Sequence, residues 1–335
     1  MTRAPQKKTT IYDLARLAGT SASTVSAVLN GRWKERRISA STADRISRLA
    51  EAQGYAVNIP ASMLRRERSH VVGMIVPKYD NRYFGSIIEG FEMRARERGL
   101  FPVTTCTLRD PGLEIEAART MISYQVDWLV ATGATDPDRI ADLCRAAGVR
   151  AVNLDLPGAR APSVISDNRG GALMLARRLL ARSGGGAPML FVGGRGQDHN
   201  TLARLDGFRA AHAERGIAVD ERLVLTCGYS ADKAEAALEA FAADRRVPKA
   251  VFVNSTISLE GVVRWLRRRA AAGGAQPLIG CFDWDPFAAH LAGGIDMIRQ
   301  DVPVMLDRVF ALMDGAGDPP ALIEVPPILI PAEEG

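Results

Sequence analysis

Residues 10–31 read TIYDLARLAGTSASTVSAVLNG, and this stretch predicts two short helices joined by a tight turn. Apolar residues recur at positions 11, 14, 15, 17 and 18, which is a helical spacing. Thr10 stands three residues before Asp13, as in a capping box, and Gly19 ends this first helix. Ser21 caps a second helix over residues 22–30. With a third predicted helix over residues 40–53, the pattern is typical of a helix-turn-helix.

The second predicted helix carries small and hydroxylic residues on its outward face. Its inward face is formed by Val25, Val28 and Leu29. The outward positions are Ala22, Ser23, Thr24, Ser26 and Ala27. Such a face can approach the wall of a duplex groove closely and donate hydrogen bonds to phosphates and bases.

Positive charge is concentrated at the start of the chain. Residues 1–68 contain 13 lysines and arginines against 5 acidic residues, whereas the whole chain of 335 residues has a net charge of +5. The remaining residues therefore carry a small net negative charge. This asymmetry favours a nucleic-acid-binding head on a near-neutral body, because neutralising phosphates supplies much of the affinity for DNA. A merely solvated basic arm is the alternative.

Several classes of protein are disfavoured by what the sequence lacks. The opening residues MTRAPQKKTT predict no signal peptide, and no apolar run approaches the ~20 residues of a membrane span, so we expect a cytoplasmic protein. The four cysteines are scattered singly, which is typical of reduced thiols rather than zinc ligands or disulfides. No zinc-protease, nucleophile-elbow or phosphate-loop motif occurs. We expect neither an enzyme nor a cofactor.

From residue 71 onward, strand-like runs alternate with amphipathic helices. Strands are predicted at 71–77, 101–105, 128–131, 151–154, 189–192, 223–226, 250–254 and 278–282, and helices at 84–98, 114–125, 169–182, 202–215, 231–243 and 259–272. Such alternation predicts parallel sheets with helices on both faces. Two sets in tandem imply two Rossmann-like lobes, whose ligand lies at the carboxyl ends of the strands.

The head resembles that of the lactose-repressor family. The likeness continues through Gly54-Tyr55-Ala56-Val57-Asn58 and Ala61-Ser62-Met63-Leu64-Arg65, which are similar to the family's hinge, and through the body. It implies a small all-α helix-turn-helix head plus an α/β body with two lobes of the periplasmic-binding-protein (type I) fold. It also implies a transcriptional repressor that binds palindromic half-sites of double-stranded DNA as a homodimer and is nucleoid-associated. The effector would be a small molecule, a sugar or sugar phosphate.

By matching position, the resemblance places the recognition helix in the major groove. The base-reading positions would be Ala22, Ser23 and Ala27. The phosphate-holding and neighbouring positions would be Thr10, Tyr12, Ser21, Thr24, Ser26, Asn30, Ser39, Thr42 and Tyr55. In the hinge, Leu64 would wedge into the minor groove, with Ala61 against it and Asn58 near the backbone. An ordinary linker hydrophobe is the alternative for Leu64.

Two features depart from the usual family pattern. Ala27 stands where a large polar reader is common, so we expect an apolar contact or none at that base. The segment Gly31-Arg32-Trp33-Lys34-Glu35-Arg36-Arg37 is longer than the usual turn and is similar to that of fructose-repressor-type members. Arg32, Trp33, Lys34, Arg36 and Arg37 can reach phosphates or bases, and a mobile loop screened by salt is the alternative.

The candidate effector residues follow the predicted strands. They are Asp80, Asn81, Tyr83, Phe84, Asp155, Asp198, Asn200, Arg204, Tyr229, Ser255, Thr256, Asp283 and Gln300, and Asn254 belongs to the same strand end as Ser255 and Thr256. Arg204 belongs to Arg-Leu-Asp-Gly-Phe at 204–208, similar to a family motif, and its guanidinium can bind two hydroxyls or a carboxylate. Arg82 and Arg195 would suit a phosphorylated sugar. For each candidate the alternative is a helix cap or a bond between the lobes.

The predicted domain plan has three parts. Residues 1–57 form the DNA-binding domain, 58–68 the hinge, and 69–335 the effector-binding and dimerisation domain. The first lobe takes about 71–165 and 300–325, and the second about 166–298 and 326–335. The stripe Ile87, Ile88, Phe91 and Leu100 fits core packing better than a dimer surface. A sugar-binding module without DNA binding is the alternative function.

Overall fold

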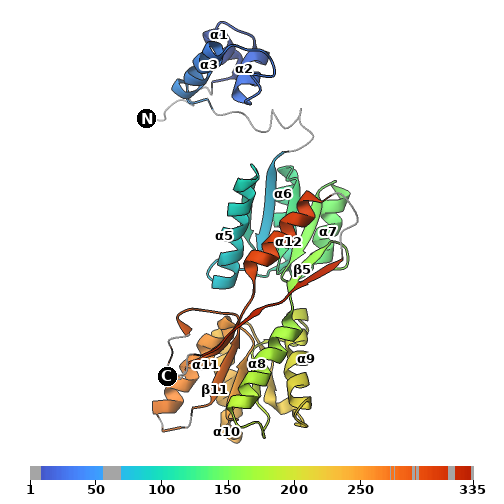
Figure 1. The fold of residues 1–335 in the computed structure, drawn as a ribbon, viewed down its shortest axis with the longest axis vertical. Coiled ribbons are helices and arrows are strands. Elements are labelled where there is room, and N and C mark those ends of the chain that lie inside the picture. The colour runs from blue at the N-terminus through green and yellow to red at the C-terminus, as the bar shows by residue number, and fades with distance from the viewer. Residues whose placement is uncertain are drawn as a thin grey trace. The chain divides into compact units, whose positions relative to one another are not determined.

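The computed structural model describes residues 9–55, 69–271, 273–274, 276–288, 291, 294–315 and 321–332. The chain divides into two compact units, with the boundary between Ser69 and His70. Each unit is described by itself. We call the first the head and the second the body (Figure 1).

The head is a three-helix unit formed by α1 (Ile11–Leu17), α2 (Ala22–Leu29) and α3 (Ala40–Ala52). Leu14, Val25 and Ile46 come from one helix each and are fully buried together. The predicted capping box is present, since Asp13 N–H donates to the Thr10 hydroxyl and Thr10 N–H donates to the Asp13 carboxylate. Gly19 has a φ of +59°, which glycine adopts without strain. The predicted helix-turn-helix is confirmed.

The first lobe of the body contains a six-stranded parallel sheet. In spatial order its strands are β13 (Leu322–Val325), β5 (Ser163–Ser166), β4 (Arg150–Leu154), β3 (Trp128–Thr132), β1 (Val71–Val76) and β2 (Phe101–Cys106). Its helices are α5 (Arg82–Glu97), α6 (Pro111–Ser123), α7 (Pro137–Ala146) and α12 (Val302–Asp314). The alternation of side chains along buried strands gives each face its own core.

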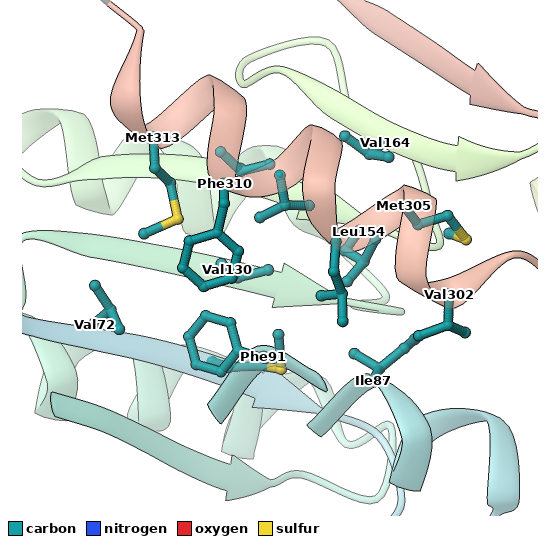
Figure 2. Close-up of a cluster of buried hydrophobic side chains, with 14 of the residues drawn as sticks. Val72, Ile87, Phe91, Val130, Leu154, Val164, Val302, Met305, Phe310 and Met313 are labelled. Atoms are coloured by element: carbon teal, nitrogen blue, oxygen red, sulfur yellow. The ribbon is translucent and has the colours of Figure 1, made fainter. Parts of the chain in front are cut away.

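Opposite faces of the first sheet pack against different helices. Val72, Met74 and Val130 face α5 and α12, as Figure 2 shows for the aromatic pair Phe91 and Phe310, whose ring centroids lie 5.6 Å apart. Ile75 and Leu129 face α6 and α7 instead. The sheet is therefore buried on both sides, so that only its strand ends are open to a ligand.

The second lobe repeats this plan. Its sheet has the order β14 (Ile328–Ile330), β12 (Asp296–Arg299), β11 (Leu278–Phe282), β10 (Ala250–Val253), β6 (Leu190–Val192) and β8 (Val224–Leu225), with β14 antiparallel to β12. Helices α8 (Asn168–Arg182) and α9 (His199–Ala213) cover one face, and α10 (Ala231–Asp244) and α11 (Thr256–Ala271) cover the other. Strands β7 (Gly194–Arg195) and β9 (Cys227–Gly228) form a small antiparallel ribbon, and Glu221–Leu223 is a 3-10 turn.

The chain passes between the two lobes three times (Figure 1). It crosses from β5 to α8, returns from β12 to α12, and crosses again from β13 to β14. The α/β body with two lobes is confirmed as predicted. Because the parallel strands of each sheet end at the crossings, their carboxyl ends are brought to the junction of the lobes.

Several helices begin earlier than the sequence pattern predicted, because a polar residue caps each one. Asn81 caps α5, Asp110 caps α6 and Asp198 caps α9. Helices α7 and α12 were not predicted. In both, an aspartate cap is followed by a proline in the first turn, a helix start that the sequence pattern did not use.

The stripe considered for dimerisation belongs to the core of the first lobe. Ile87 and Phe91 are fully buried, and Ile88 and Leu100 pack against the same cluster. Core packing, the interpretation that the sequence favoured, accounts for these four residues.

Candidate functional site

Three polar candidates of the head begin its helices. Thr10, Ser21 and Ser39 cap α1, α2 and α3, and each hydroxyl accepts a backbone N–H three residues on. A capped helix start carries partial positive charge and is a ready site for a phosphate. On α2, Ser23 is exposed, while Ala22, Thr24, Ser26 and Ala27 are half-buried. Tyr12 is 75% exposed, and Thr42 is half-buried.

The lengthened turn after α2 presents its cations outward. Arg32, Lys34, Arg36 and Arg37 are exposed, whereas Trp33 packs against the head core. The Lys34 ammonium lies 5.4 Å from the centre of the Trp33 ring. Asn30 ends α2 and donates to the Ser26 carbonyl, and Tyr55 packs beside the same core. The hinge candidates Asn58, Ala61 and Leu64 lie outside the described residues.

In the body, a buried polar network forms where strands of both sheets end. The Tyr83 hydroxyl donates to Asp155 at 3.1 Å, and the Asn200 amide donates to the same carboxylate oxygen at 3.2 Å. The Asn168 amide donates to Asn200 at 3.0 Å. Tyr83 and Asp155 belong to the first lobe, and Asn200 to the second. The carboxylate of Asp155 therefore joins the two lobes, and we call these strand ends the cleft.

Arg204 lies at the centre of this network and is 3% exposed. Its Nε donates to Asn168 at 2.8 Å, its Nη1 donates to the Asn254 carbonyl at 2.5 Å, and its guanidinium lies 3.7 Å from the centre of the Phe282 ring. Helix α9 can place it there because Gly207 allows close packing on α8, where a Cβ would come within 2.2 Å of a backbone carbonyl. The glycine of the Arg-Leu-Asp-Gly-Phe motif thus positions the arginine.

Two aspartates occupy equivalent positions in the two lobes. Asp155 follows β4 with a φ of +74°, and Asp283 follows β11 with a φ of +77°. Non-glycine residues rarely adopt this conformation, and its strain is concentrated at functional sites. Both side chains are buried, and Asp283 accepts a hydrogen bond of 2.6 Å from Gln300. The fold holds a strained carboxylate at the end of each sheet.

Burial dominates the electrostatics of the cleft. It raises the pKa of Asp155 to about 6, although Arg109 and Arg204 act to lower it. Burial also raises the pKa of Asp283, again against Arg204. The pKa of the Tyr83 hydroxyl lies well above its usual value. Burial is the main cause, and the charge of Asp155 is the second. Tyr83 is therefore a neutral donor, and the two carboxylates are poorly solvated.

The most informative atoms of the cleft are buried polar groups without a hydrogen-bond partner in the described chain. They are both amide atoms of the Asn254 side chain, the hydroxyls of Ser255 and Ser258, and Oε1 of Gln300. Leaving such a group unpaired costs about 1–3 kcal/mol. Native proteins rarely tolerate several together unless they serve a ligand or water. Asn254, Ser255 and Gln300 are therefore suited to bind hydroxyl groups.

A second cluster lies at the entrance to α9. The Tyr229 hydroxyl donates to Asp198 at 2.6 Å and lies 3.1 Å from the Thr201 hydroxyl. The Arg109 guanidinium lies 5.2 Å from the centre of the Tyr229 ring. Burial raises the pKa of Tyr229 to about 12. This cluster ties Arg109 of the first lobe to an aromatic ring of the second.

The structure places four predicted effector residues outside the hydrogen-bond network of the cleft. Asp80 is exposed and pairs with Lys78. The Asn81 side chain accepts hydrogen bonds from two backbone N–H groups at the start of α5. Phe84 is buried in the core of the first lobe. Thr256 begins α11 and is half-buried. The fold places the other predicted residues in the cleft or beside it. They are Tyr83, Asp155, Asp198, Asn200, Arg204, Tyr229, Ser255, Asp283 and Gln300.

Two further cleft residues were not among the predicted candidates. Asn168 holds Arg204 together with the carbonyl of Asn254, and Arg109 lies near both cleft carboxylates. Asn168 follows β5, a strand that the sequence pattern did not predict, so the rule that polar strand ends are candidates could not have found it. Arg109 lies in the loop after β2 with a φ of +58°, and no local pattern marks it.

A pocket of about 450 Å³ opens between the lobes beside the cleft. Its lining includes Tyr83, Asp283 and Gln300 together with residues of α5 and α12. This volume lies within the usual range for small-molecule sites. At its edge, Arg82 of the first lobe donates to Asp285 of the second at 3.1 Å.

The sequence matches two protein-family models. Residues 10–58 match the model described as bacterial regulatory proteins, lacI family, and residues 72–313 match the periplasmic binding protein domain. The ribitol operon repressor of Klebsiella aerogenes is 65% identical over 193 residues, which are 56% of this chain and 72% of that protein. The sucrose operon repressor of Klebsiella pneumoniae is 30% identical over 320 residues, 94% of this chain and 95% of that one.

This chain belongs to the lacI family of bacterial regulatory proteins. Its fold agrees, since a lac repressor dimer bound to operator and the anti-inducer ONPF has a TM-score of 0.79 at 21% identity, covering 97% of this chain and 98% of that one. A Cra regulator from Pseudomonas putida in complex with fructose 1-phosphate has a TM-score of 0.70 at 22% identity, covering 79% and 99%.

Membership of the lacI family confirms a DNA-binding transcriptional regulator rather than an enzyme. The alternative of a sugar-binding module without DNA binding is disfavoured, because the match includes the head at residues 10–58. No helix in the described part of the chain combines the length and apolarity needed to cross a membrane.

Proposed function

We propose that this lacI-family regulator represses an operon for polyol use and that its effector is an uncharged molecule of the pentitol or pentulose class. The observation that carries this proposal is the set of buried, unpartnered polar groups in the cleft, namely those of Asn254, Ser255 and Gln300. A polyhydroxyl molecule could pair with all of them at once. The 65% identity to a ribitol operon repressor supports a five-carbon polyol.

The charges in the cleft favour an uncharged effector over a sugar phosphate. Asp155 and Asp283 are buried carboxylates, and Asp198 lies near Asp155. Two donors of Arg204 already bind Asn168 and the Asn254 carbonyl. Arg82, one candidate for a phosphate, pairs with Asp285, and Arg195, the other, is exposed. A phosphate would meet these carboxylates as well as Arg109 and Arg204, whereas hydroxyl groups can donate hydrogen bonds to the carboxylates without burying a further charge.

We infer that the effector changes how the two lobes close. The bonds Asn200–Asp155 and Arg82–Asp285 cross between them, and Tyr83, Asp283 and Gln300 line the pocket at the same junction. A ligand that pairs with residues of both lobes stabilises one closure state in proportion to its differential affinity. Through the hinge, that preference alters the free energy of operator binding.

On the DNA side, α2 would enter the major groove, and Ala22, Ser23 and Ala27 would face bases. The capped helix starts and the cations of the lengthened turn would bind phosphates. As a homodimer the protein would recognise two half-sites about one helical turn apart. Leu64 would wedge into the minor groove, so Leu64→Ala should remove specific affinity. The division into a DNA-binding domain (residues 1–57), a hinge (58–68) and an effector-binding domain (69–335) stays a prediction. The location of the protein in the cytoplasm, at the nucleoid, also stays a prediction.

The test uses the full chain with ribitol, D-ribulose, ribitol 5-phosphate and sucrose. Thermal shift and calorimetry should detect ribitol or D-ribulose, and Asn254→Ala should abolish that response while leaving operator affinity intact. The matched head variant Asn30→Ala should weaken operator binding and keep the thermal response. A response to the phosphate ester alone, or equal responses in wild type and Asn254→Ala, would show that the effector assignment is wrong.

A further inference from the structure

Arg109 is carried by a strained turn that follows β2. Thr107 N–H donates to the Val76 carbonyl at 2.9 Å, which fixes the start of the turn at the carboxyl ends of the strands. The turn closes with a bond of 2.9 Å from Asp110 N–H to the Thr107 carbonyl. Its two central residues, Leu108 and Arg109, have φ values of +54° and +58°, where glycine, asparagine and aspartate are usual. Strain of this kind is concentrated at functional sites.

The Arg109 guanidinium lies near one aromatic ring of each lobe. It is 5.9 Å from the centre of the Phe84 ring in the first lobe and 5.2 Å from the centre of the Tyr229 ring in the second. Both distances allow cation–π attraction. The Phe84 ring adjoins a cleft carboxylate, because a Cβ on Gly133 would lie 3.0 Å from Oδ2 of Asp155 and 3.5 Å from Cε1 of Phe84. The guanidinium is therefore placed beside the polar network that joins the lobes.

The hydrogen-bond donors of Arg109 are not used within the described part of the chain. There the guanidinium has no hydrogen bond and no ion pair, although the side chain is half-buried. Arg204, by contrast, donates to Asn168 and to the Asn254 carbonyl. A guanidinium has five N–H donors in a planar fork, and donors that are removed from water without a partner are costly. The donors of Arg109 therefore remain for a ligand or for water.

The charge of Arg109 acts on both cleft carboxylates. Burial raises the pKa of Asp155 and that of Asp283, and the charge of Arg109 opposes this effect at each of them. The two carboxylates thus already supply negative charge near this cation, so its ligand need not be an anion. An uncharged molecule can accept hydrogen bonds from the guanidinium without bringing a further charge into the cleft.

We propose that Arg109 is an effector-binding residue whose planar fork donates to two neighbouring oxygens of the effector, as in a vicinal diol or an α-hydroxy ketone. This inference rests on the proposed function, because it takes an uncharged pentitol or pentulose as the ligand. Two adjacent oxygens can accept two parallel N–H bonds, which adds geometric selectivity to the attraction. The Phe84 and Tyr229 rings hold the fork in place from the two lobes, so a ligand bound to it favours the closure state in which both rings are near.

The test measures binding of ribitol and D-ribulose to the full chain by calorimetry. Arg109→Ala should weaken binding by about tenfold or more, as expected for the loss of hydrogen bonds to a charged group. Arg109→Lys keeps the charge but not the planar fork, so it should remain weaker than wild type by about threefold or more. Arg119→Ala, at an exposed position of α6 outside the cleft, is the matched control and should bind like wild type.

The same variants separate hydrogen bonding from an electrostatic effect on the carboxylates. Loss of the charge in Arg109→Ala should move the pKa of Asp155 above its value of about 6, and Arg109→Lys should restore that value. The other charged groups that act on Asp155, namely Arg204, Asp198 and Asp283, are unchanged in both variants. The pH dependence of the free energy of unfolding measures the shift. If Arg109→Lys restores both this pKa and full effector affinity, Arg109 acts only through its charge and the proposal is wrong.

The remaining outcomes distinguish this inference from the proposed function. Equal affinity of wild type and Arg109→Ala for ribitol or D-ribulose would overturn the role of Arg109 and leave the proposed function standing. Failure of wild type to bind either compound would overturn the proposed function and this inference with it. Tighter binding of ribitol 5-phosphate than of ribitol, lost in Arg109→Ala, would show that Arg109 binds an anion instead.

Discussion

The polar residues of the head and those of the cleft differ in how they are satisfied. In the head, hydroxyls such as Ser21 and Ser39 lie at the surface and pair with backbone groups three residues away. In the cleft, Arg204, Asp155 and Asn200 are buried and pair with residues more than thirty positions away, while Asn254 has unpaired amide atoms. The polar groups of the head thus find hydrogen-bond partners within the head itself and leave an outward surface for binding. In the cleft, by contrast, some buried polar groups gain partners only when a ligand binds. Changing a cleft residue should therefore alter the free energy of unfolding, in either direction, far more than changing a residue of the head.

The largest effect should come from Arg204→Ala. It leaves Asn168 and the Asn254 carbonyl without their donor and removes a cation beside two buried carboxylates. Breaking one side of a buried charge network costs about 3–5 kcal/mol, so the free energy of unfolding should fall by about that amount and the effector response should vanish. Urea denaturation and calorimetry measure both.

Arg209→Ala is the matched control for Arg204→Ala. It lies on the same helix and forms an exposed pair with Glu221. Exposed pairs contribute about 0–1 kcal/mol, so its removal should hardly change stability or effector binding. Equal effects of the two variants would contradict the central place given to Arg204.

Asp155→Asn should stabilise the protein while weakening effector binding. Burial raises the pKa of Asp155 from its usual 3.8 to about 6, so between these pH values the native carboxyl keeps a proton that the unfolded chain releases. Stability therefore falls as pH rises through this window, and the cost, about 3 kcal/mol, is complete above pH ~6. Asparagine carries no such charge and can still accept hydrogen bonds from Tyr83 and Asn200.

The measurement is the free energy of unfolding at pH 5 and pH 7.5. The difference between these values should shrink in Asp155→Asn and persist in Asp206→Asn, whose carboxylate is exposed beside Arg169. A pH dependence in Asp155→Asn that equals wild type would exclude Asp155 as its source.

The contrast between head and cleft also explains what the sequence could predict. The head helices depend on local signals, such as the Thr10–Asp13 box and Gly19, so they were predicted nearly residue by residue. Strand–helix alternation predicted both lobes. The cleft depends on which strand ends meet, so Arg204 and Asp283 were found by their place after strands or in a motif. Arg109 was missed because only the folded loop brings it near Tyr229. Asp80 follows β1, but its side chain turns to Lys78.

A smaller effect is expected in the head from Ser21→Ala. Loss of an N-cap costs about 1 kcal/mol of stability, and operator affinity should fall with it while effector binding is unchanged. Ser21→Asp separates the two roles, since aspartate caps equally well but repels a phosphate. It should restore the unfolding free energy of the head and still weaken operator binding. Full recovery of operator affinity in Ser21→Asp would show that Ser21 acts only as a helix cap and does not bind a phosphate.

The smallest effect should come from Arg36→Ala in the lengthened turn. Removing one cation that neutralises a DNA phosphate lowers the slope of log affinity against log salt by about 1. Operator titrations at several salt concentrations should detect this change with little loss of sequence preference. Arg48→Ala, on α3 and paired with Asp44, should keep the wild-type slope. Identical slopes for both variants would mean that the turn is a solvated loop.

The most direct test titrates ribitol and D-ribulose into the full chain bound to a fluorescent palindromic operator from its own promoter region, followed by anisotropy. We predict that one of these uncharged compounds changes operator affinity at least tenfold, and that Asn254→Ala removes the change without altering affinity for bare operator. Operator affinity that neither compound alters, or equal binding to an unrelated duplex, would contradict this prediction.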